Sequence, residues 1–435
     1  MLTFSTIENI QKIFTFNCNY IEAFCSFSPF LLLYRFILLF LLHVMELSQR
    51  LDEKLEKQES AKKTFRLKLQ GAKNTILQHE DLSYQQTALD TIDFGLVLAE
   101  GRKWKEKELE QGHEAPEDCM LLAGLLAWFK HNFFSWCNKP LCQNKDCTPT
   151  VKCQVDDMTS SGMVEPTQDE RADGASRVET YTCRHCKTVT RFARFNSPCA
   201  LLRTKTGRCG EWANCFGLIC RAVGFDTRYV LDFTDHVWCE VWLPSKGRYC
   251  HCDPCENSLD APLTYECGWG KQLTYILSVS IHGVVDASAK YTQQLSHIVE
   301  RREALGYGAP EVWIQEEIAA TDRDMYAQWL SVQTSHAPPD RLRGSSETEP
   351  IDHISMSYSA AMTAVAQGKE AVAAWALKNR HIDIKAIEMR RSALQQELIA
   401  LSQDANYGIK NVAETIGRTS GDITWIQQRQ ELGNK

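Results

Sequence analysis

The chain has 435 residues, of which 44% are hydrophobic and 24% are charged, a composition typical of globular proteins. Its 48 basic and 55 acidic residues give a formal charge of -7, and without a basic excess the composition does not indicate nucleic acid as a partner. The 18 cysteines are spread over a large chain, which argues against a disulfide scaffold and favours reduced thiols and metal ligands.

Residues 1–45 form an apolar N-terminal extension. Within it, residues 29–45 (PFLLLYRFILLFLLHVM) have about the minimum length of a membrane span. Arg35 in the middle of this run costs about 2.5–3.5 kcal/mol on insertion, and no small-residue cleavage site follows. We expect an extension outside the functional fold, or a translation start at Met45; membrane association of this run is the alternative.

The next segment, residues 46–132, is predicted to be a helical N-terminal region. Up to about residue 109 it is charged, with apolar residues at helical spacing. Residues 119–134 (CMLLAGLLAWFKHNFF) are apolar on most sides, which indicates a buried helix. Residues 156–176 are acidic, carry Gly and Ser and have no period, so they are predicted to form an exposed loop.

An α+β core is predicted from about residue 180 to residue 291. There the composition shifts to aromatics, cysteines and β-branched residues in short alternating runs, and a helix over residues 210–223 precedes several strands. A linker over residues 334–350 follows, and residues 351–435 are predicted to be a helical C-terminal region that packs or faces solvent.

Three residues in this core have the order of a nucleophile, its base and an orienting acid. Cys209, in GRCGEWANCF, lies at a helix entry, where an ionised thiol is favoured, whereas Cys215 lies inside the helix. His236 begins a strand pattern and Asp253 ends the next strand. Taken alone, such a histidine usually packs and an Asp before a proline usually makes a turn. Their order on a helix and two following strands is what indicates a catalytic triad.

Two cysteine pairs have metal-ligand spacing. Cys183-x2-Cys186 is a zinc knuckle, and Cys142-x4-Cys147 can supply the other two ligands. Four cysteine ligands leave no open coordination position, so the predicted zinc site is structural rather than catalytic.

Several long strings resemble the core of cytoplasmic peptide N-glycanases, which are members of the transglutaminase-like superfamily with a papain-like Cys-His-Asp triad. These strings are LLRTKTGRCGEWANCFGLICRAVGFDTRYVLDFTDHVWCEVW, HCDPCE and YECGWGKQLTYI, within residues 133–280, and residues 417–433 are similar to the family's C-terminal segment. The resemblance implies a zinc-binding subdomain at residues 133–200 and a transglutaminase-like cysteine-hydrolase core at residues 201–333.

The same resemblance assigns roles to residues. It implies Cys209 as nucleophile, His236 as general base and acid, and Asp253 as the residue that orients it. The family holds a structural zinc with x2 spacing in both cysteine pairs, and the x4 spacing here departs from it. Rival ligands to Cys147 are therefore Cys137 and Cys153.

The implied sugar-binding residues are Trp136, Glu256 and Trp269. The competing interpretation is core packing for both tryptophans and a solvated turn for Glu256. Backbone N–H groups at the start of the Cys209 helix, with Trp212 or Trp238, are candidates for stabilising an oxyanion.

The implied activity is hydrolysis of the β-aspartylglucosaminyl bond of N-glycosylated asparagine in misfolded glycoproteins and glycopeptides, which converts Asn to Asp through a cysteine thioester. The implied setting is the cytoplasm, or the nucleus or ER surface, in ER-associated degradation with a ubiquitin/proteasome shuttle protein as partner. Two alternatives stay open: a transglutaminase-like peptidase or acyltransferase, and a catalytically silent zinc-bearing scaffold for shuttling partners.

Overall fold

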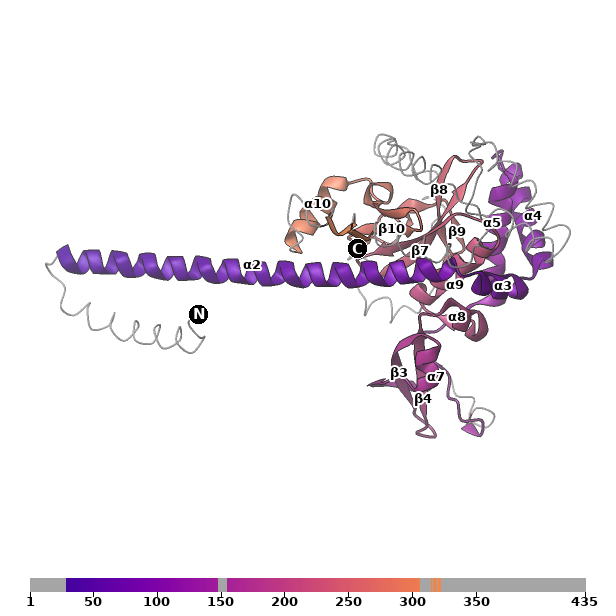
Figure 1. Ribbon diagram of the computed structural model, residues 1–435, viewed down its shortest axis with the longest axis horizontal. Coiled ribbons are helices and arrows are strands. Elements are labelled where there is room, and N and C mark those ends of the chain that lie inside the picture. Colours follow the sequence, from indigo (N-terminus) through magenta and orange to yellow (C-terminus); the bar gives the residue numbers. More distant parts are fainter. Residues whose placement is uncertain (1–28, 148–154, 306–313, 315, 319, 322–435) are drawn as a thin grey trace, which may run out of the picture. The chain divides into compact units, whose positions relative to one another are not determined.

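The computed structural model describes residues 29–147 and 155–305, with 314, 316–318 and 320–321 (Figure 1). The chain divides into two compact units, residues 1–61 and residues 62–435. The predicted linker at 334–350, the predicted helical region at 351–435 and Cys153 lie outside the described residues.

The described part of the first unit belongs to helix α2 (Pro29–His79), which continues into the second unit. Ile37, Phe40 and Leu51 on this helix are each at least half exposed, at 50%, 65% and 57%. Among the described residues, no helix combines the length and the hydropathy that crossing a membrane requires.

Two further helices follow within the predicted helical N-terminal region, residues 46–132: α3 (Leu82–Thr91) and α4 (Phe94–Glu110). Each begins after an aspartate whose carboxylate accepts backbone N–H groups of the first turn: Asp81 accepts from Ser83 and Tyr84, and Asp93 accepts from Leu96. N-cap aspartates therefore divide the charged, helix-forming sequence into separate helices.

Helix α5 (Glu117–Trp128) continues into a π-helical turn, η1 (Phe129–Phe133), and its side chains are buried on nearly all sides, as predicted. It approaches α4 closely, because a Cβ at Gly124 would lie 2.2 Å from the carbonyl oxygen of Val97. The Phe129 ring packs edge-on against Trp212 and Phe216, with centroids 5.5 and 5.2 Å away. The buried helix thus supports the helix that carries Cys209.

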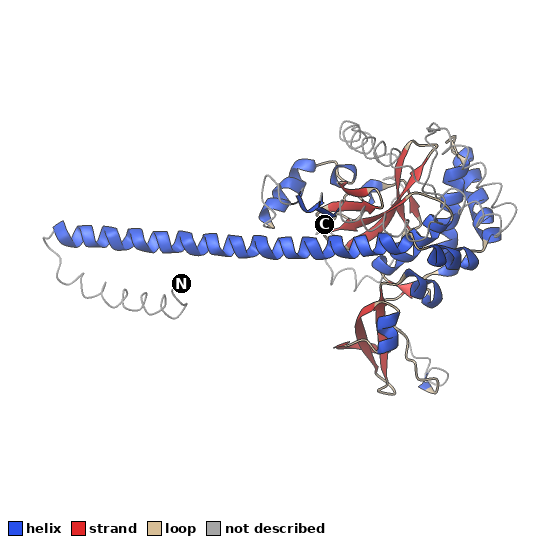
Figure 2. Ribbon diagram, in the orientation of Figure 1, coloured by secondary structure: helices blue, strands red, loops and turns tan. Residues whose placement is uncertain are grey.

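A six-stranded antiparallel sheet forms the centre of the second unit, with the order β11-β10-β6-β7-β8-β9 (Figure 2). Helix α9 (Cys209–Ala222) packs against β6 and β7, which confirms the predicted α+β core. The strands are β6 (Thr227–Asp232), β7 (His236–Leu243), β8 (Arg248–Asp253), β9 (Ser258–Leu259), β10 (Ile276–Ser280) and β11 (Gly283–Asp286).

A separate three-stranded antiparallel sheet consists of β2 (Met158–Val164), β3 (Ala175–Cys183) and β4 (Val189–Phe195). The prediction of a loop over residues 156–176 is wrong, because β2 and helix α7 (Gln168–Ala172) lie within it. Of the β2 side chains only Met158 is buried, so backbone pairing with β3 holds the strand. Its sequence therefore lacks the alternation of hydrophobic and polar residues from which a strand is predicted.

Short elements connect these parts. A two-residue parallel pairing of β1 (Ser135–Trp136) with β5 (Thr206–Gly207) places Trp136 opposite Gly207, two residues before Cys209. The remaining elements are η2 (Val155–Asp157), α8 (Pro198–Thr204), η3 (Pro262–Thr264), η4 (Ser288–Lys290) and α10 (Leu295–Ala304).

Candidate active site and metal centre

Cys209 is the first residue of α9, as the sequence predicts, and it is half-buried. The Glu211 carboxylate turns back and accepts the backbone N–H of Arg208 at 3.1 Å. A Cβ at Gly207 would lie 2.4 Å from Glu211 Cβ, so this close turn needs glycine there. The thiol therefore lies at the partially positive end of a helix, an environment that favours a thiolate.

Two hydrogen bonds join the first turns of α9 to the sheet. The Tyr229 hydroxyl donates to the Gly210 carbonyl at 3.4 Å, and the Cys239 thiol donates to the Ala213 carbonyl at 3.3 Å. Cys215 and Cys220, further along the helix, are fully buried, and burial raises the pKa of both thiols well above its ordinary value. The interior thiols of α9 are thus kept neutral, unlike a thiol at the helix start.

His236 and Asp253 meet across neighbouring antiparallel strands. His236 begins β7 and Asp253 ends β8, so the register brings them to the same end of the sheet. The His236 Nε2 atom lies 2.8 Å from Asp253 Oδ2, and both side chains are fully buried. This contact gives the neutral imidazole its proton on Nε2 and leaves Nδ1 as the basic nitrogen.

The Asp253 carboxylate has donors on both oxygens. Its Oδ1 accepts the backbone N–H of Cys255 at 2.8 Å, and its Oδ2 accepts the Tyr265 hydroxyl at 2.9 Å as well as His236. Burial raises the pKa of Asp253, but the charge and hydrogen bond of His236 and the Tyr265 hydrogen bond outweigh it and lower the pKa to about 2. Asp253 is therefore a carboxylate throughout the neutral range.

The three residues implied to bind sugar lie in different environments. Trp136 is half-buried on β1, and its indole N–H donates to Asn138 Oδ1 at 2.6 Å. Trp269 is only 1% exposed and packs edge-on against His236, with ring centroids 5.0 Å apart. Glu256 is half-buried three residues after Asp253. Burial of Trp269 supports the packing interpretation for this residue, and one of the rings against which it packs is that of His236.

Both tryptophans considered for an oxyanion site use their indole N–H groups inside the protein. Trp212 donates to the Gly207 carbonyl at 3.3 Å, and Trp238 donates to the Tyr291 hydroxyl at 2.9 Å. The backbone N–H groups at the start of α9 therefore remain the candidates for stabilising an oxyanion.

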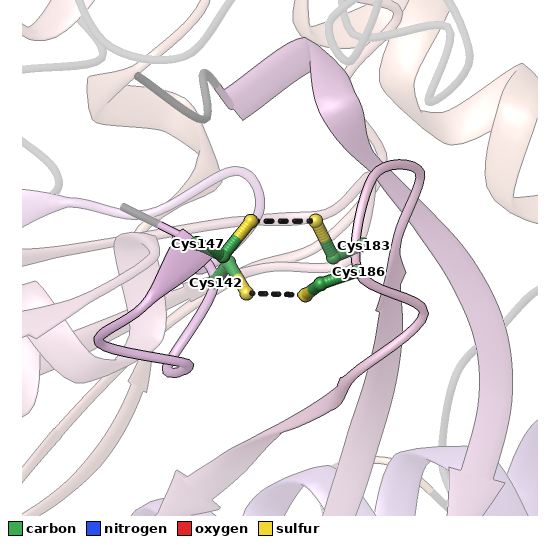
Figure 3. Close-up of side chains that lie close together, drawn as sticks. All are labelled: Cys142, Cys147, Cys183 and Cys186. Atoms are coloured by element: carbon green, nitrogen blue, oxygen red, sulfur yellow. Dashed lines mark hydrogen bonds between the residues drawn. The ribbon is translucent and has the colours of Figure 1, made fainter. Parts of the chain in front are cut away.

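Four cysteines gather into one cluster, which we call the cysteine cluster: Cys142, Cys147, Cys183 and Cys186 (Figure 3). All four sulfurs lie within 4.8 Å of one another, with Cys142 and Cys186 3.5 Å apart and Cys147 and Cys183 3.8 Å apart. A tetrahedral site with Zn–S bonds of about 2.3 Å has sulfurs roughly 3.8 Å apart. The cysteine cluster can therefore hold such a metal ion, and all its members are thiols.

The knuckle between β3 and β4 is prepared for ionised thiols. The Thr188 hydroxyl and backbone N–H lower the pKa of Cys186 to about 6, and the backbone N–H of Cys186 lowers the pKa of Cys183. Of the rival ligands to Cys147, Cys137 is partly buried and packs beside the cluster rather than joining it.

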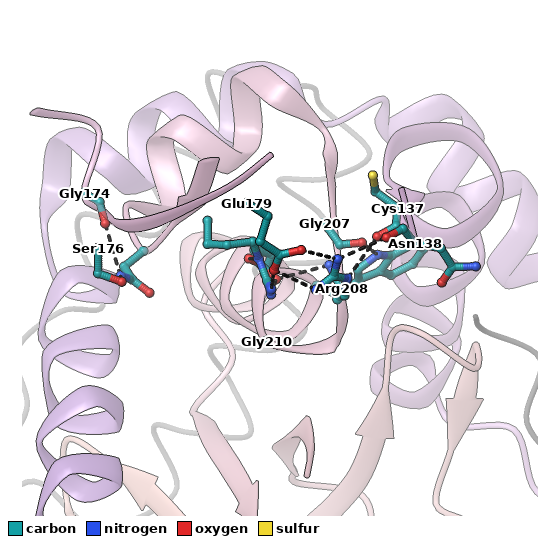
Figure 4. A network of polar contacts seen from close by, with 12 residues as sticks. Cys137, Asn138, Gly174, Ser176, Glu179, Gly207, Arg208 and Gly210 are labelled. Atoms are coloured by element: carbon teal, nitrogen blue, oxygen red, sulfur yellow. Dashed lines mark hydrogen bonds and ion pairs between the residues drawn. The ribbon is translucent and has the colours of Figure 1, made fainter. Parts of the chain in front are cut away.

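A buried ion network, which the sequence analysis missed, connects the small sheet with α9 (Figure 4). Arg208, the residue before Cys209, donates to both oxygens of Glu179 on β3, at 2.9 and 2.7 Å. Arg194 on β4 donates to Glu179 at 2.9 Å and to Glu211 at 2.7 Å. The strand that ends in Cys183 is thus ion-paired to the start of the Cys209 helix. The sequence signal was the Arg208–Glu211 pair flanking Cys209.

Residues 157–254 match the family model described as the transglutaminase-like superfamily. The chain is 42% identical over 250 residues to the peptide-N(4)-(N-acetyl-beta-glucosaminyl)asparagine amidase of Gallus gallus, a match that covers 57% of this chain and 37% of that protein. It is 42% identical over 239 residues to the human amidase, covering 54% and 35% of the two chains. The amidase of Arabidopsis thaliana is 44% identical over 236 residues, covering 52% and 30%. The chain spans about a third of the length of these curated relatives.

Proposed function

We propose that this chain, a homologue of peptide N-glycanases over its transglutaminase-like core, is a cysteine-dependent amidase that removes N-linked glycans from asparagine. The observation that carries the proposal is the buried His236–Asp253 pair, 2.8 Å apart, in the same unit as a helix that begins at Cys209. A transglutaminase-like core with this pair has the parts for acyl transfer at an amide.

The first half of the reaction forms a thioester. The Cys209 thiolate attacks the side-chain carbonyl carbon of the glycosylated asparagine, and backbone N–H groups at the start of α9 stabilise the oxyanion. The C–S bond forms as the amide bond between the side-chain carbonyl carbon and its nitrogen breaks, and the nitrogen leaves still bonded to the sugar. The imidazolium of His236, which carries the proton given up by the Cys209 thiol, transfers it to the departing glycosylamine nitrogen, while Asp253 keeps the ring oriented.

Water completes the second half. Neutral His236 removes a proton from a water molecule, whose oxygen attacks the thioester carbon. The C–O bond forms, the C–S bond breaks, and the Cys209 thiolate is restored. The peptide leaves with aspartate in place of the glycosylated asparagine.

Trp136, Glu256 and Trp269 are proposed to form the sugar-binding part of the site: Trp136 and Glu256 would touch the sugar, whereas Trp269, which is 1% exposed, would act by packing against His236. The pairing of Trp136 with Gly207 puts this half-buried tryptophan beside the Cys209 helix, and Trp269 contacts His236. Glu256 follows Asp253 closely in sequence. An aromatic face and a carboxylate are suited to a sugar's apolar face and hydroxyl groups.

Zinc is the proposed ion of the cysteine cluster. Cys142, Cys147, Cys183 and Cys186 would hold it through four thiolates, and the ion would cross-link the β3–β4 knuckle with the segment after β1. A four-thiolate ion has no open position and supplies stability rather than a step of the reaction.

The proposed substrates are misfolded N-glycosylated proteins and glycopeptides, met in the cytoplasm, where thiols stay reduced. The nucleus and the ER surface are further proposed locations. A ubiquitin/proteasome shuttle protein is the proposed partner, which would link deglycosylation to ER-associated degradation. Pull-down of such a protein by the full chain, and its loss on deleting residues 351–435, would test the partner separately from the activity.

The activity is tested with a denatured glycopeptide and the same peptide without its glycan, with zinc present and thiols reduced. We expect release of the intact glycan and conversion of that one asparagine to aspartate, detected by mass spectrometry. Cleavage or crosslinking of the unglycosylated peptide would instead support a transglutaminase-like peptidase or acyltransferase. No change in either peptide would contradict the proposed amidase.

A further inference from the structure

A hydrogen-bonded row of buried side chains extends from Asp253 beyond the proposed triad. Tyr265 donates its hydroxyl to Asp253 Oδ2 at 2.9 Å, and His251 Nε2 lies 2.7 Å from the Tyr265 oxygen. His251, Tyr265, Asp253 and His236 are all fully buried. Two of these residues have no part in the reaction steps above.

The direction of each hydrogen bond in the row is fixed. His251 Nδ1 accepts the backbone N–H of Ala261 at 3.2 Å, so the proton of the neutral ring is on Nε2 and is donated to Tyr265. The Tyr265 proton then points to Asp253, because its oxygen is already an acceptor. Asp253 Oδ2 thus receives two side-chain donors, Tyr265 and His236.

The protonation states suit this row. Burial lowers the pKa of His251 to about 4, so its ring is neutral at neutral pH. Burial also raises the pKa of Tyr265 well above its ordinary value, so the phenol stays protonated. Both donors are therefore present throughout the range in which a thiolate–imidazole pair works.

Aromatic packing prevents the Tyr265 ring from turning away. It stacks on Trp238 with centroids 4.1 Å apart and meets Trp269 edge-on at 5.1 Å. The His236 ring lies against the same group, 5.2 Å from the Tyr265 centroid. Tyr265 therefore holds the carboxylate from a rigid base and also contacts the imidazole directly.

We propose that Tyr265 and His251 are positioning residues of the triad: they fix the Asp253 carboxylate, and through it the His236 ring, in the orientation that serves Cys209. The proposal rests on the amidase proposed above. Without the Tyr265 hydroxyl, His236 would be the one side-chain donor on Asp253 Oδ2 among the hydrogen bonds described, and the carboxylate would rotate more freely as His236 gains and loses its proton.

The test uses the full chain and two readouts: the rate at which iodoacetamide alkylates Cys209 at neutral pH, and kcat and KM for a glycopeptide. Tyr265→Phe removes only the hydroxyl. We expect both the alkylation rate and kcat to fall about 10-fold, the size of one lost hydrogen bond, with KM nearly unchanged. His251→Leu should reproduce this effect, and His251→Gln, which keeps an N–H donor, should restore most of the rate.

Tyr249→Phe is the matched control, because Tyr249 is an equally buried phenol that donates to another carboxylate, Asp226, at 2.8 Å. Wild-type alkylation rates in Tyr265→Phe, or equal losses in Tyr249→Phe, would overturn the proposal. If Tyr265→Phe fails to fold, the difference between His251→Gln and His251→Leu decides in its place. An inactive wild type whose alkylation still depends on Tyr265 would contradict the amidase but support the positioning role.

Discussion

The proposed triad and the cysteine cluster both depend on thiols, but the environments of these thiols differ. The cluster brings four sulfurs within 4.8 Å, where a metal ion can share their charge. The triad instead isolates Cys209 at a helix start, in the same unit as a fully buried imidazole and carboxylate 2.8 Å apart. We propose that the thiols of the cysteine cluster are structural and that Cys209 is reactive. Glu179 and Arg208 connect the two regions.

The largest expected effect is a loss of activity that leaves the cysteine cluster unchanged. His236→Ala should lower kcat/KM for a glycopeptide by about 10⁴-fold, because it removes the general base and acid, while metal content stays at the wild-type level. His282→Ala is the matched control, since His282, in the turn between β10 and β11, makes another His–carboxylate contact, 3.0 Å from Asp226. Comparable losses of activity in both variants would contradict a specific role for His236.

Removing the proposed metal ion should destabilise the cysteine cluster and the β2–β4 sheet first. Chelation, or Cys183→Ser, is expected to lower Tm by about 5–10 °C, corresponding to roughly 3 kcal/mol, and to open β2–β4 to proteolysis. Zinc content measured beside Tm, with Cys220→Ala as a buried-thiol control, checks this. A chain that binds no metal at wild-type stability would exclude a structural metal site.

Removing the charge of Glu179, which joins β3 to Arg208, should have an intermediate effect on stability and on the alkylation of Cys209. Glu179→Gln leaves Arg208 and Arg194 with a neutral partner and should cost about 2 kcal/mol, less than the 3–5 of a fully buried pair because the Glu179 side chain is 14% exposed. We also expect slower alkylation of Cys209, since Arg208 precedes it. Glu170→Gln removes the charge of an ion pair between helix α7 and Arg191 on β4, whose Nε lies 2.9 Å from Glu170 Oε1, and should lower stability slightly without slowing alkylation. Equal alkylation rates in the two variants would contradict a link between the Glu179 ion pairs and the reactivity of Cys209.

The effect that is smallest at neutral pH is a pH dependence of stability, which develops only in acid. His251 has its pKa lowered by burial to about 4 from an ordinary 6.5, so between these values the unfolded chain binds a proton that the folded chain does not. Its contribution to stability is complete above pH 6.5 and is lost as pH falls toward 4. His251→Gln should reduce the slope of unfolding free energy against pH in that window by about 1.4 kcal/mol per unit. Denaturant titrations at several pH values measure it, and an unchanged slope would contradict a neutral buried His251.

Sequence spacing was enough to predict the parts of each region that are local. The C-x2-C knuckle brought Cys183 and Cys186 together, and the glycines around Cys209 indicated a helix entry. The order of helix and strands also anticipated that His236 and Asp253 would meet, since adjacent antiparallel strands align the start of one with the end of the next.

Other parts depend on tertiary contacts that no spacing encodes. Strand β2 has almost no buried side chain, so only its pairing with β3 reveals it. Tyr265 reaches Asp253 from outside the sheet, and Glu179 meets Arg208 from 29 residues away. One signal was available: His251 lies two residues before Asp253 on β8, and alternate residues of a strand share a face.

The central claim is that Cys209 alone among the thiols attacks the glycosylated asparagine. The most direct measurement is the conversion of a denatured glycopeptide, followed by mass spectrometry, in the wild type, Cys209→Ala and Cys215→Ala. We predict conversion of asparagine to aspartate by the wild type and by Cys215→Ala, and none by a folded, metal-containing Cys209→Ala. Conversion by Cys209→Ala at the wild-type rate would contradict the account.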